Sequence, residues 1–206
     1  MAPQIVRVDP LAPDARLLRE AARVLRGGGL VAFPTETFYG LGAAALDRVA
    51  VRRVFEIKGR PASMPLLVLV DDAARLRDLV TDVPQRAQTL MERHWPGPLT
   101  LVFRAAAHLP NELTAGTGTV GVRVPSHRVP RAIVTQLNAA ITAPSANRTG
   151  AAPPTAADTV LAYFGDAIDL VLDAGPTAGG EPSTVVDVTV DPPRVLRHGA
   201  ITLGSS

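Results

Sequence analysis

The sequence predicts an α/β domain in which a mixed sheet is covered by flanking helices. Short runs of branched apolar residues alternate with amphipathic segments of helical period along the chain. The 17 glycines and 19 prolines are typical of many tight turns between such elements. No linker or internal repeat divides the 206 residues, so we expect a single domain over residues 1–206 with its core at about 14–200.

The first third of the chain follows this alternation closely. Residues 5–8 have a strand pattern, and Asp14 is a candidate cap for an amphipathic helix that ends at Gly27. A buried strand at 30–33 then leads into a turn through Gly40 and Gly42. The elements expected next are a helix at about 47–57, a loop at 58–61, a strand at 65–70 and helices at about 73–79 and 84–94.

The remaining residues repeat the same theme. Apolar patterns predict strands at 99–103, 118–124, 139–144, 170–172, 184–190 and 194–196. Helical patterns lie between them at 129–137 and 155–163. Because helices must cover the apolar faces of the sheet, this order supports the mixed α/β arrangement.

Composition excludes several classes of protein. There is no cysteine, which rules out disulfides and thiolate metal sites. Met1–Pro10 lacks the apolar centre of a signal peptide, and no apolar run approaches the ~20 residues of a membrane span, so we expect a cytoplasmic protein without a membrane partner. The net charge of +2 does not by itself indicate a nucleic-acid-binding protein.

Lys58 is the only lysine among 21 basic residues, the others being arginines. A biased genome would explain the excess of arginine, and the remaining lysine then marks a place where a compact ammonium is needed. Chance retention is the alternative. Lys58 and Arg60 can direct two cations toward one anion, as phosphate binding requires, or they can form an ordinary basic helix end.

Three further segments bring polar groups to predicted strand ends. Thr35 follows the strand at 30–33 and can hydrogen-bond a small ligand, although it could instead cap the turn while Tyr39 packs. Ser145 and Asn147 can contact phosphate oxygens or metal-bound water. Arg123 lies in an apolar strand and needs either an internal carboxylate or a ligand carboxylate as its partner.

Other familiar sites are missing from the sequence. No Gly-Lys-Ser/Thr follows Gly27–Gly29, so this is no phosphate-binding loop, and there is no Gly-x-Ser-x-Gly motif of a serine hydrolase. The four histidines lack metal-ligand spacing.

Taken together, the polar segments resemble the YrdC-like family in order and spacing. The matching motifs are Pro34-Thr35-Glu36-Thr37, Tyr39-Gly40-Leu41-Gly42, Lys58-x-Arg60-Pro61, Val122-Arg123-Val124-Pro125, Ser145-Ala146-Asn147 and Ser183-Thr184-Val185-Val186-Asp187. The resemblance implies an open, twisted sheet around a deep basic cavity. Met64 and Leu69 depart from the pattern, since many relatives have a lysine and a histidine there.

The resemblance also implies a reaction, the joining of L-threonine, bicarbonate and ATP into threonylcarbamoyl-adenylate for tRNA modification, with Mg²⁺ accompanying the ATP. It implies that Lys58 and Arg60 are catalytic. The residues expected to bind ATP are Lys58, Arg60, Thr119, Ser145, Asn147 and Arg197, and those expected to bind threonine are Thr35, Arg123, Ala143 and Ser183. The ligands of the metal are left open.

The chain resembles the short bacterial form of the family, so we expect other proteins to transfer the product to tRNA. Two alternatives remain at this stage. One is a module that binds double-stranded RNA directly, and the other is a diverged protein of the same fold that acts in carbamoyl transfer. The joint presence of the Lys-x-Arg and Ser-x-Asn motifs favours adenylate synthesis over both.

Overall fold

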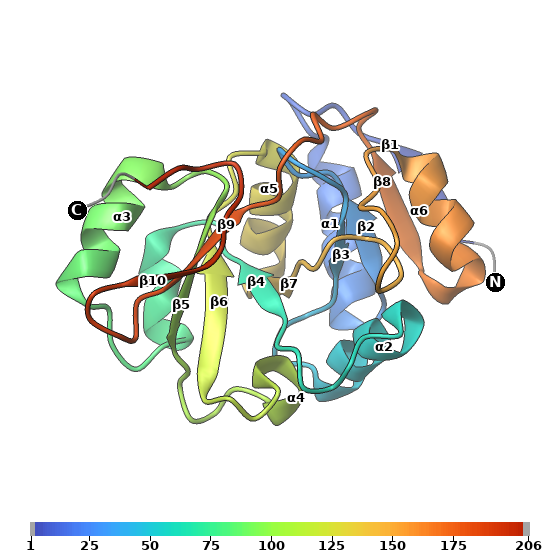
Figure 1. The fold of residues 1–206 in the computed structure, drawn as a ribbon. Coiled ribbons are helices and arrows are strands. Elements are labelled where there is room, and N and C mark those ends of the chain that lie inside the picture. The colour runs from blue at the N-terminus through green and yellow to red at the C-terminus, as the bar shows by residue number, and fades with distance from the viewer. Residues whose placement is uncertain (1–2, 204–206) are drawn as a thin grey trace.

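The computed structural model describes residues 3–203 and confirms the α/β class (Figure 1). Its helices are α1 (Ala15–Arg26), α2 (Arg48–Lys58), α3 (Gln85–His94), α4 (Asn111–Thr114), α5 (Arg128–Leu137) and α6 (Ala157–Phe164), with 3₁₀ helices η1 (Ala73–Asp78) and η2 (Gly165–Ala167). Its strands are β1 (Gln4–Arg7), β2 (Val31–Phe33), β3 (Gly40–Gly42), β4 (Leu67–Leu69), β5 (Leu99–Arg104), β6 (Thr119–Arg123), β7 (Ile141–Thr142), β8 (Leu170–Asp173), β9 (Thr184–Asp187) and β10 (Arg194–Arg197).

The strands form two mixed sheets, where the sequence suggested one. One has the order β1-β8-β2-β3 and the other the order β10-β9-β5-β6-β4-β7. Hydrogen bonds from Leu41 N to Pro144 O (2.9 Å) and from Ala45 N to Ala140 O (3.0 Å) join the β3 edge of the first sheet to the β7 edge of the second. The two sheets therefore meet along β3 and β7.

Local capping fixes the helices beside this junction. Asp14 accepts a hydrogen bond from Arg16 N (2.6 Å) at the start of α1, as predicted, and Asp47 accepts from Val49 N and Ala50 N at the start of α2. Gly59 ends α2 in the left-handed region with φ 58°. Lys58 is therefore the last helical residue of α2.

The turn predicted through Gly40 and Gly42 is instead the strand β3, paired antiparallel with β2. The Phe33 ring lies against both glycines, and a Cβ at Gly42 would come within 2.7 Å of it. The two glycines thus let the Phe33 ring of β2 pack closely against β3, and they do not reverse the chain.

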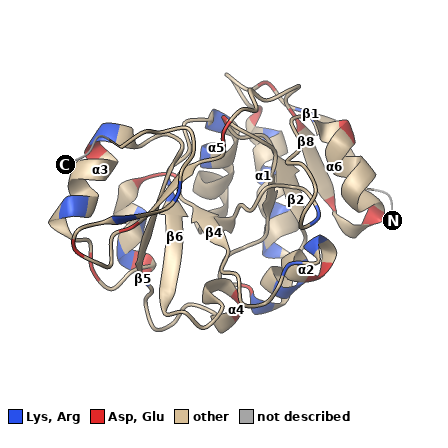
Figure 2. Cartoon of the chain, viewed as in Figure 1, with Lys and Arg blue, Asp and Glu red and all other residues tan. Residues whose placement is uncertain are grey.

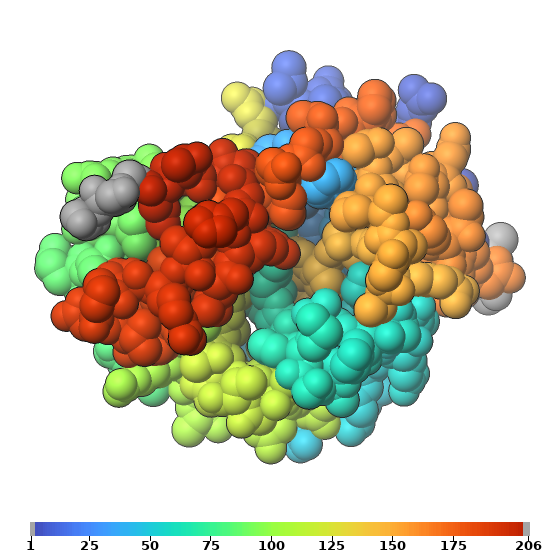
Figure 3. All heavy atoms as spheres, viewed as in Figure 1, coloured from blue at the N-terminus to red at the C-terminus, as the bar shows by residue number. Residues whose placement is uncertain are grey.

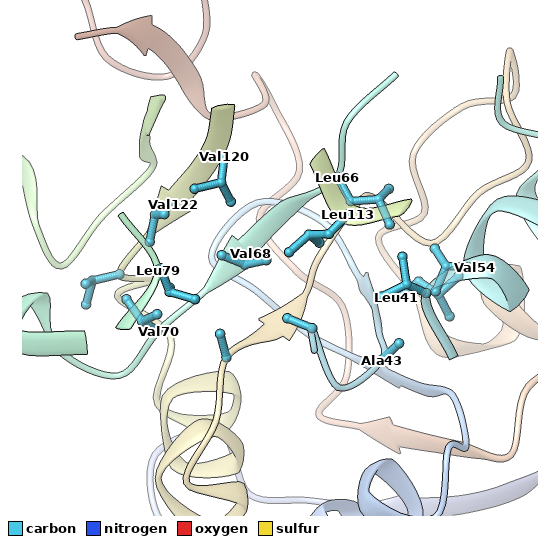
Figure 4. Packing of buried hydrophobic residues seen from close by; sticks show 14 of the residues in the cluster. Leu41, Ala43, Val54, Leu66, Val68, Val70, Leu79, Leu113, Val120 and Val122 are labelled. Carbon is cyan, nitrogen blue, oxygen red and sulfur yellow. The ribbon is translucent and has the colours of Figure 1, made fainter. Parts of the chain in front are cut away.

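Two apolar cores lie on opposite faces of the strands. Alternate residues of each strand point to opposite faces, so Val31 and Phe33 pack with α1 and α5 while Ala32 faces the other core. Figure 4 shows side chains of this second core from both sheets, with Leu41 of β3 beside Val54 of α2 and Leu113 between Leu41 and Val68 of β4. The packing supports one compact unit over the described residues.

Charged residues of both signs lie on the outer helices (Figure 2). None of the helices within residues 3–203 is both long and apolar enough to cross a membrane.

Candidate active site

A cavity of about 580 Å³ is lined by residues from both sheets. Figure 3 shows the surface hollowed between the red C-terminal segment and the teal segment around α2. Its charged lining residues within the described part of the chain are three arginines, Arg60, Arg123 and Arg197, with no carboxylate among them. Such a lining favours an anionic ligand.

Seven of the ten predicted site residues line this cavity, although they lie far apart in the sequence. They are Thr35, Arg60, Arg123, Ala143, Ser145, Ser183 and Arg197. The other three, Lys58, Thr119 and Asn147, are not among its lining residues. Thr119 is on the same face of β6 as Gly121 and Arg123, which both line the cavity, but it lies at the far end of that strand.

Thr35 belongs both to the cavity and to the local turn. Its hydroxyl donates to Phe38 O (2.7 Å) and accepts from Thr37 N (3.2 Å). Tyr39 is fully buried and donates to Gly175 O (2.7 Å), and burial raises the pKa of its hydroxyl to about 12. The capping alternative therefore describes the turn correctly, while Thr35 is also a lining residue of the cavity.

Arg123 forms an ion pair with an internal carboxylate, Glu36. Its Nη2 lies 2.5 Å from Glu36 Oε1, without hydrogen-bond geometry, and its Nε donates to Gly97 O (3.1 Å). Burial alone would raise the pKa of Glu36, but the charge of Arg123 and the Ser126 amide lower it below its ordinary value. Since Arg123 also lines the cavity, the same residue pairs with an internal carboxylate and borders the space for a ligand.

Arg197 and Ser183 form a second polar group at the cavity wall. Arg197 donates to the Ser183 carbonyl (2.8 and 3.1 Å) and hydroxyl (3.0 Å), and that hydroxyl lies 2.9 Å from Thr100 Oγ1. Arg60 donates to the carbonyls of Met64 and Pro65. Burial and the neighbouring charge of Arg197 lower the pKa of Arg60, so an anion between these cations would be stabilised.

Lys58 lies directly behind this wall. Its Nζ donates to Ser145 O (2.6 Å) and Asn147 O (2.5 Å), and the residue is 4% exposed. Burial, with a smaller effect of Arg60, lowers the pKa of Lys58 to about 8. The site thus uses a compact ammonium to tie the end of α2 to the Ser145–Asn147 segment, which a bulkier planar guanidinium would not fit equally well.

Comparison with known proteins identifies the family. Residues 23–199 match the Sua5/YciO/YrdC family, described as "Telomere recombination". The chain belongs to this family.

Two curated relatives from this comparison carry the same name, threonylcarbamoyl-AMP synthase. The Pyrococcus abyssi protein is 45% identical over 186 residues, covering 90% of this chain and 55% of the relative. The Bacillus subtilis protein is 42% identical over 195 residues, covering 94% of this chain and 56% of the relative. The chain therefore spans a little more than half the length of these two relatives.

The structural comparison agrees with the sequence comparison. A crystal structure of P. abyssi Sua5 complexed with L-threonine superposes with a TM-score of 0.91 at 44% identity, covering 95% of this chain and 57% of that one. The expected resemblance to the YrdC-like family is thereby confirmed. The deep basic cavity that the resemblance implies stays a prediction beyond the arginine lining described above.

Sequence reasoning did not name some of the cavity residues as site candidates. Thr100 is buried and links Ser183 to β5, yet it lies within the apolar run 99–103. A lone polar residue in an apolar strand is the signal that also singled out Arg123, and it would have found Thr100. Met64 and Leu69, the two departures from the family pattern, both line the cavity.

Proposed function

We propose that the chain synthesises threonylcarbamoyl-AMP from L-threonine, bicarbonate and ATP, releasing pyrophosphate. Family membership supports this activity, as do the name of the two relatives and the L-threonine in the P. abyssi complex. The observation that carries the proposal is the convergence of seven predicted site residues on one cavity, whose charged lining residues within 3–203 are all arginines. The product would serve threonylcarbamoyladenosine modification of tRNA in the cytoplasm, with other proteins transferring it.

The reaction has two steps. The amine of threonine attacks bicarbonate to give a carbamate, with loss of water. A carbamate oxygen then attacks the α-phosphorus of ATP, and the bond to the bridging oxygen breaks to release pyrophosphate. Negative charge gathers on the phosphoryl oxygens and the leaving group, so positioned cations can supply most of the acceleration.

Threonine would lie at the end of the cavity formed by Thr35, Arg123, Ala143 and Ser183. The Ala143 N–H already donates to Leu67 O (3.0 Å), which leaves its carbonyl for a ligand. Arg123 would bind the threonine carboxylate through the guanidinium face that lines the cavity.

ATP would lie toward Arg60, Ser145 and Arg197. Arg60 and Arg197 have only carbonyl or hydroxyl acceptors within the described residues, so their charges are available to phosphates. Lys58 and Asn147 would act from behind, by holding the Ser145 backbone in place. Thr119 would reach the nucleotide only through a part of ATP that extends along β6.

Mg²⁺ would accompany the phosphates of ATP. Magnesium usually keeps several waters and binds through substrate phosphates with few protein ligands. This suits a site where the described residues contain no group of three His, Asp or Glu side chains able to hold a metal. The Ser145 hydroxyl, on a residue that lines the cavity, is an oxygen that could take part, while the Asn147 Oδ1 is buried behind it without a hydrogen-bond partner. Bound there, the ion would neutralise phosphate charge.

The test is threonine-dependent release of pyrophosphate. The protein is incubated with ATP, bicarbonate and labelled L-threonine, and L-serine and L-valine serve as matched amino-acid controls. Release that requires threonine and bicarbonate is expected. Release with another amino acid but not with threonine would overturn the substrate assignment, and salt-dependent RNA binding without any turnover would favour the RNA-binding alternative instead.

A further inference from the structure

Glu36 lies behind Arg123 rather than in the cavity. Arg123 lines the cavity while Glu36 does not, and the two side chains are 6% and 17% exposed. Gly97 O accepts from Nε of Arg123, and Glu36 faces Nη2. Within residues 3–203 neither Nη1 nor Nη2 has a hydrogen-bond acceptor in the protein. Because Nη2 is buried against Glu36, Nη1 is the donor group that remains available to a ligand.

The three cavity arginines differ in charge compensation. Arg60 and Arg197 form no ion pair with a carboxylate in the described part of the chain, and their acceptors are backbone carbonyls and the Ser183 hydroxyl. Arg123 alone is paired with a carboxylate. The cavity therefore has a cationic part at Arg60 and Arg197 and a neutral ion-paired part at Arg123.

This division matches two ligands of different charge. A phosphate is attracted by net positive charge, whereas a zwitterionic amino acid has no net charge and is held mainly by oriented donors. Resting on the proposed function, we propose that Glu36 is a specificity-determining residue that neutralises Arg123, so that this end of the cavity accepts threonine and rejects phosphate groups. A bare Arg123 would bind either anion, and ATP phosphates would compete for the threonine position.

The geometry allows charge to be separated from positioning. Both Arg123 and the Ser126 N–H (3.1 Å) contact the same oxygen, Glu36 Oε1, and the buried Oε2 has no hydrogen-bond partner. In Glu36→Gln, the amide oxygen can take the Oε1 position and keep both contacts while the amide nitrogen replaces Oε2. The variant thus removes the negative charge and leaves the placement of Arg123 nearly intact.

The experiment is calorimetric binding of L-threonine with and without millimolar inorganic phosphate, at ionic strength matched with chloride. In the wild-type protein and in Glu92→Gln, the same change at an exposed position of α3, phosphate should leave the apparent Kd for threonine nearly unchanged. In Glu36→Gln, phosphate should raise that Kd about tenfold, because it now competes for Arg123.

Equal effects of phosphate on the wild-type protein and on Glu36→Gln would overturn the proposal. If Glu36→Gln loses threonine binding altogether, the variant and the wild-type protein are each titrated directly with phosphate. The proposal requires that Glu36→Gln binds phosphate at one more site than the wild type, and an equal number of sites refutes it. A wild-type protein that binds no L-threonine in any condition would instead refute the proposed function. The comparison of phosphate sites still tests the role of Glu36 in that case.

Discussion

Replacing Lys58 by Met should weaken both the fold and the site, because the ammonium makes two contacts that no other group can replace. Nζ donates to Ser145 O at 2.6 Å and to Asn147 O at 2.5 Å. Hydrogen bonds from a charged donor contribute about 1.5–3 kcal/mol each, so the pair contributes about 3–6 kcal/mol. Methionine fills a similar volume but donates no hydrogen bond.

Burial of the charge offsets part of this gain. A pKa lowered from 10.5 to about 8 corresponds to about 3 kcal/mol against the charged form of Lys58. The net loss on removing the ammonium is therefore about 2 kcal/mol, which for a domain of this size lowers the Tm by about 4–8 °C.

Activity should fall further than stability. Release of the Ser145–Asn147 segment shifts a cavity wall, and a displacement of about 1 Å can cost about 100-fold in rate. The assays are thermal unfolding and threonine-dependent pyrophosphate release, with the exposed Glu56→Met in the same helix as the matched control. Lys58→Arg keeps the charge and tests whether the compact ammonium is needed.

An unchanged Tm for Lys58→Met would refute the structural role assigned to Nζ. Full recovery of both stability and activity by Lys58→Arg would show that charge alone matters.

Four further outcomes follow from Lys58 and from the contacts of Tyr39 and Arg197. Because the chain has one lysine, protein labelled with ¹³C-lysine should give a single side-chain Cε signal by NMR, titrating at about pH 8, and a midpoint near 10.5 would contradict the burial of Lys58. Between about pH 8 and pH 10.5 Lys58 is protonated in the unfolded chain but largely neutral in the folded one. The unfavourable effect of the buried Lys58 charge on stability should therefore disappear as the pH rises through this range. Tyr39→Phe removes the 2.7 Å hydrogen bond to Gly175 O and should cost about 1 kcal/mol in the free energy of unfolding measured in urea. Arg197→Met should raise the KM for ATP about tenfold with a smaller effect on threonine, and the reverse pattern in steady-state kinetics would place ATP elsewhere.

Short-range features were predictable from the sequence because their causes lie within a few residues. The caps of α1 and α2 depend on an aspartate and the two or three amides that follow it, as at Asp14 and Asp47. β3 was missed for a related reason. Gly40 and Gly42 carry a local turn signal, but Phe33 on the neighbouring strand uses them for close packing.

Motif order also indicated the family, and seven of the ten site residues that it implied line the cavity. The motifs could not indicate which of the predicted site residues line the cavity and which hold its wall in place from behind. Lys58 and Asn147 support the wall from behind, and Thr119 lies at the far end of β6 from Arg123. These differences depend on where each strand ends relative to its neighbours in the sheet.

The sequence by itself determined the α/β class, the positions of the caps and the set of polar segments at strand ends, since these follow from local periodicity and residue chemistry. Only the tertiary structure decided the partners of the buried charges. Arg123 pairs with Glu36 and Lys58 reaches carbonyls 87 and 89 residues away. A buried charge must find its counterpart wherever the topology brings one within reach, and spacing along the chain does not encode that distance.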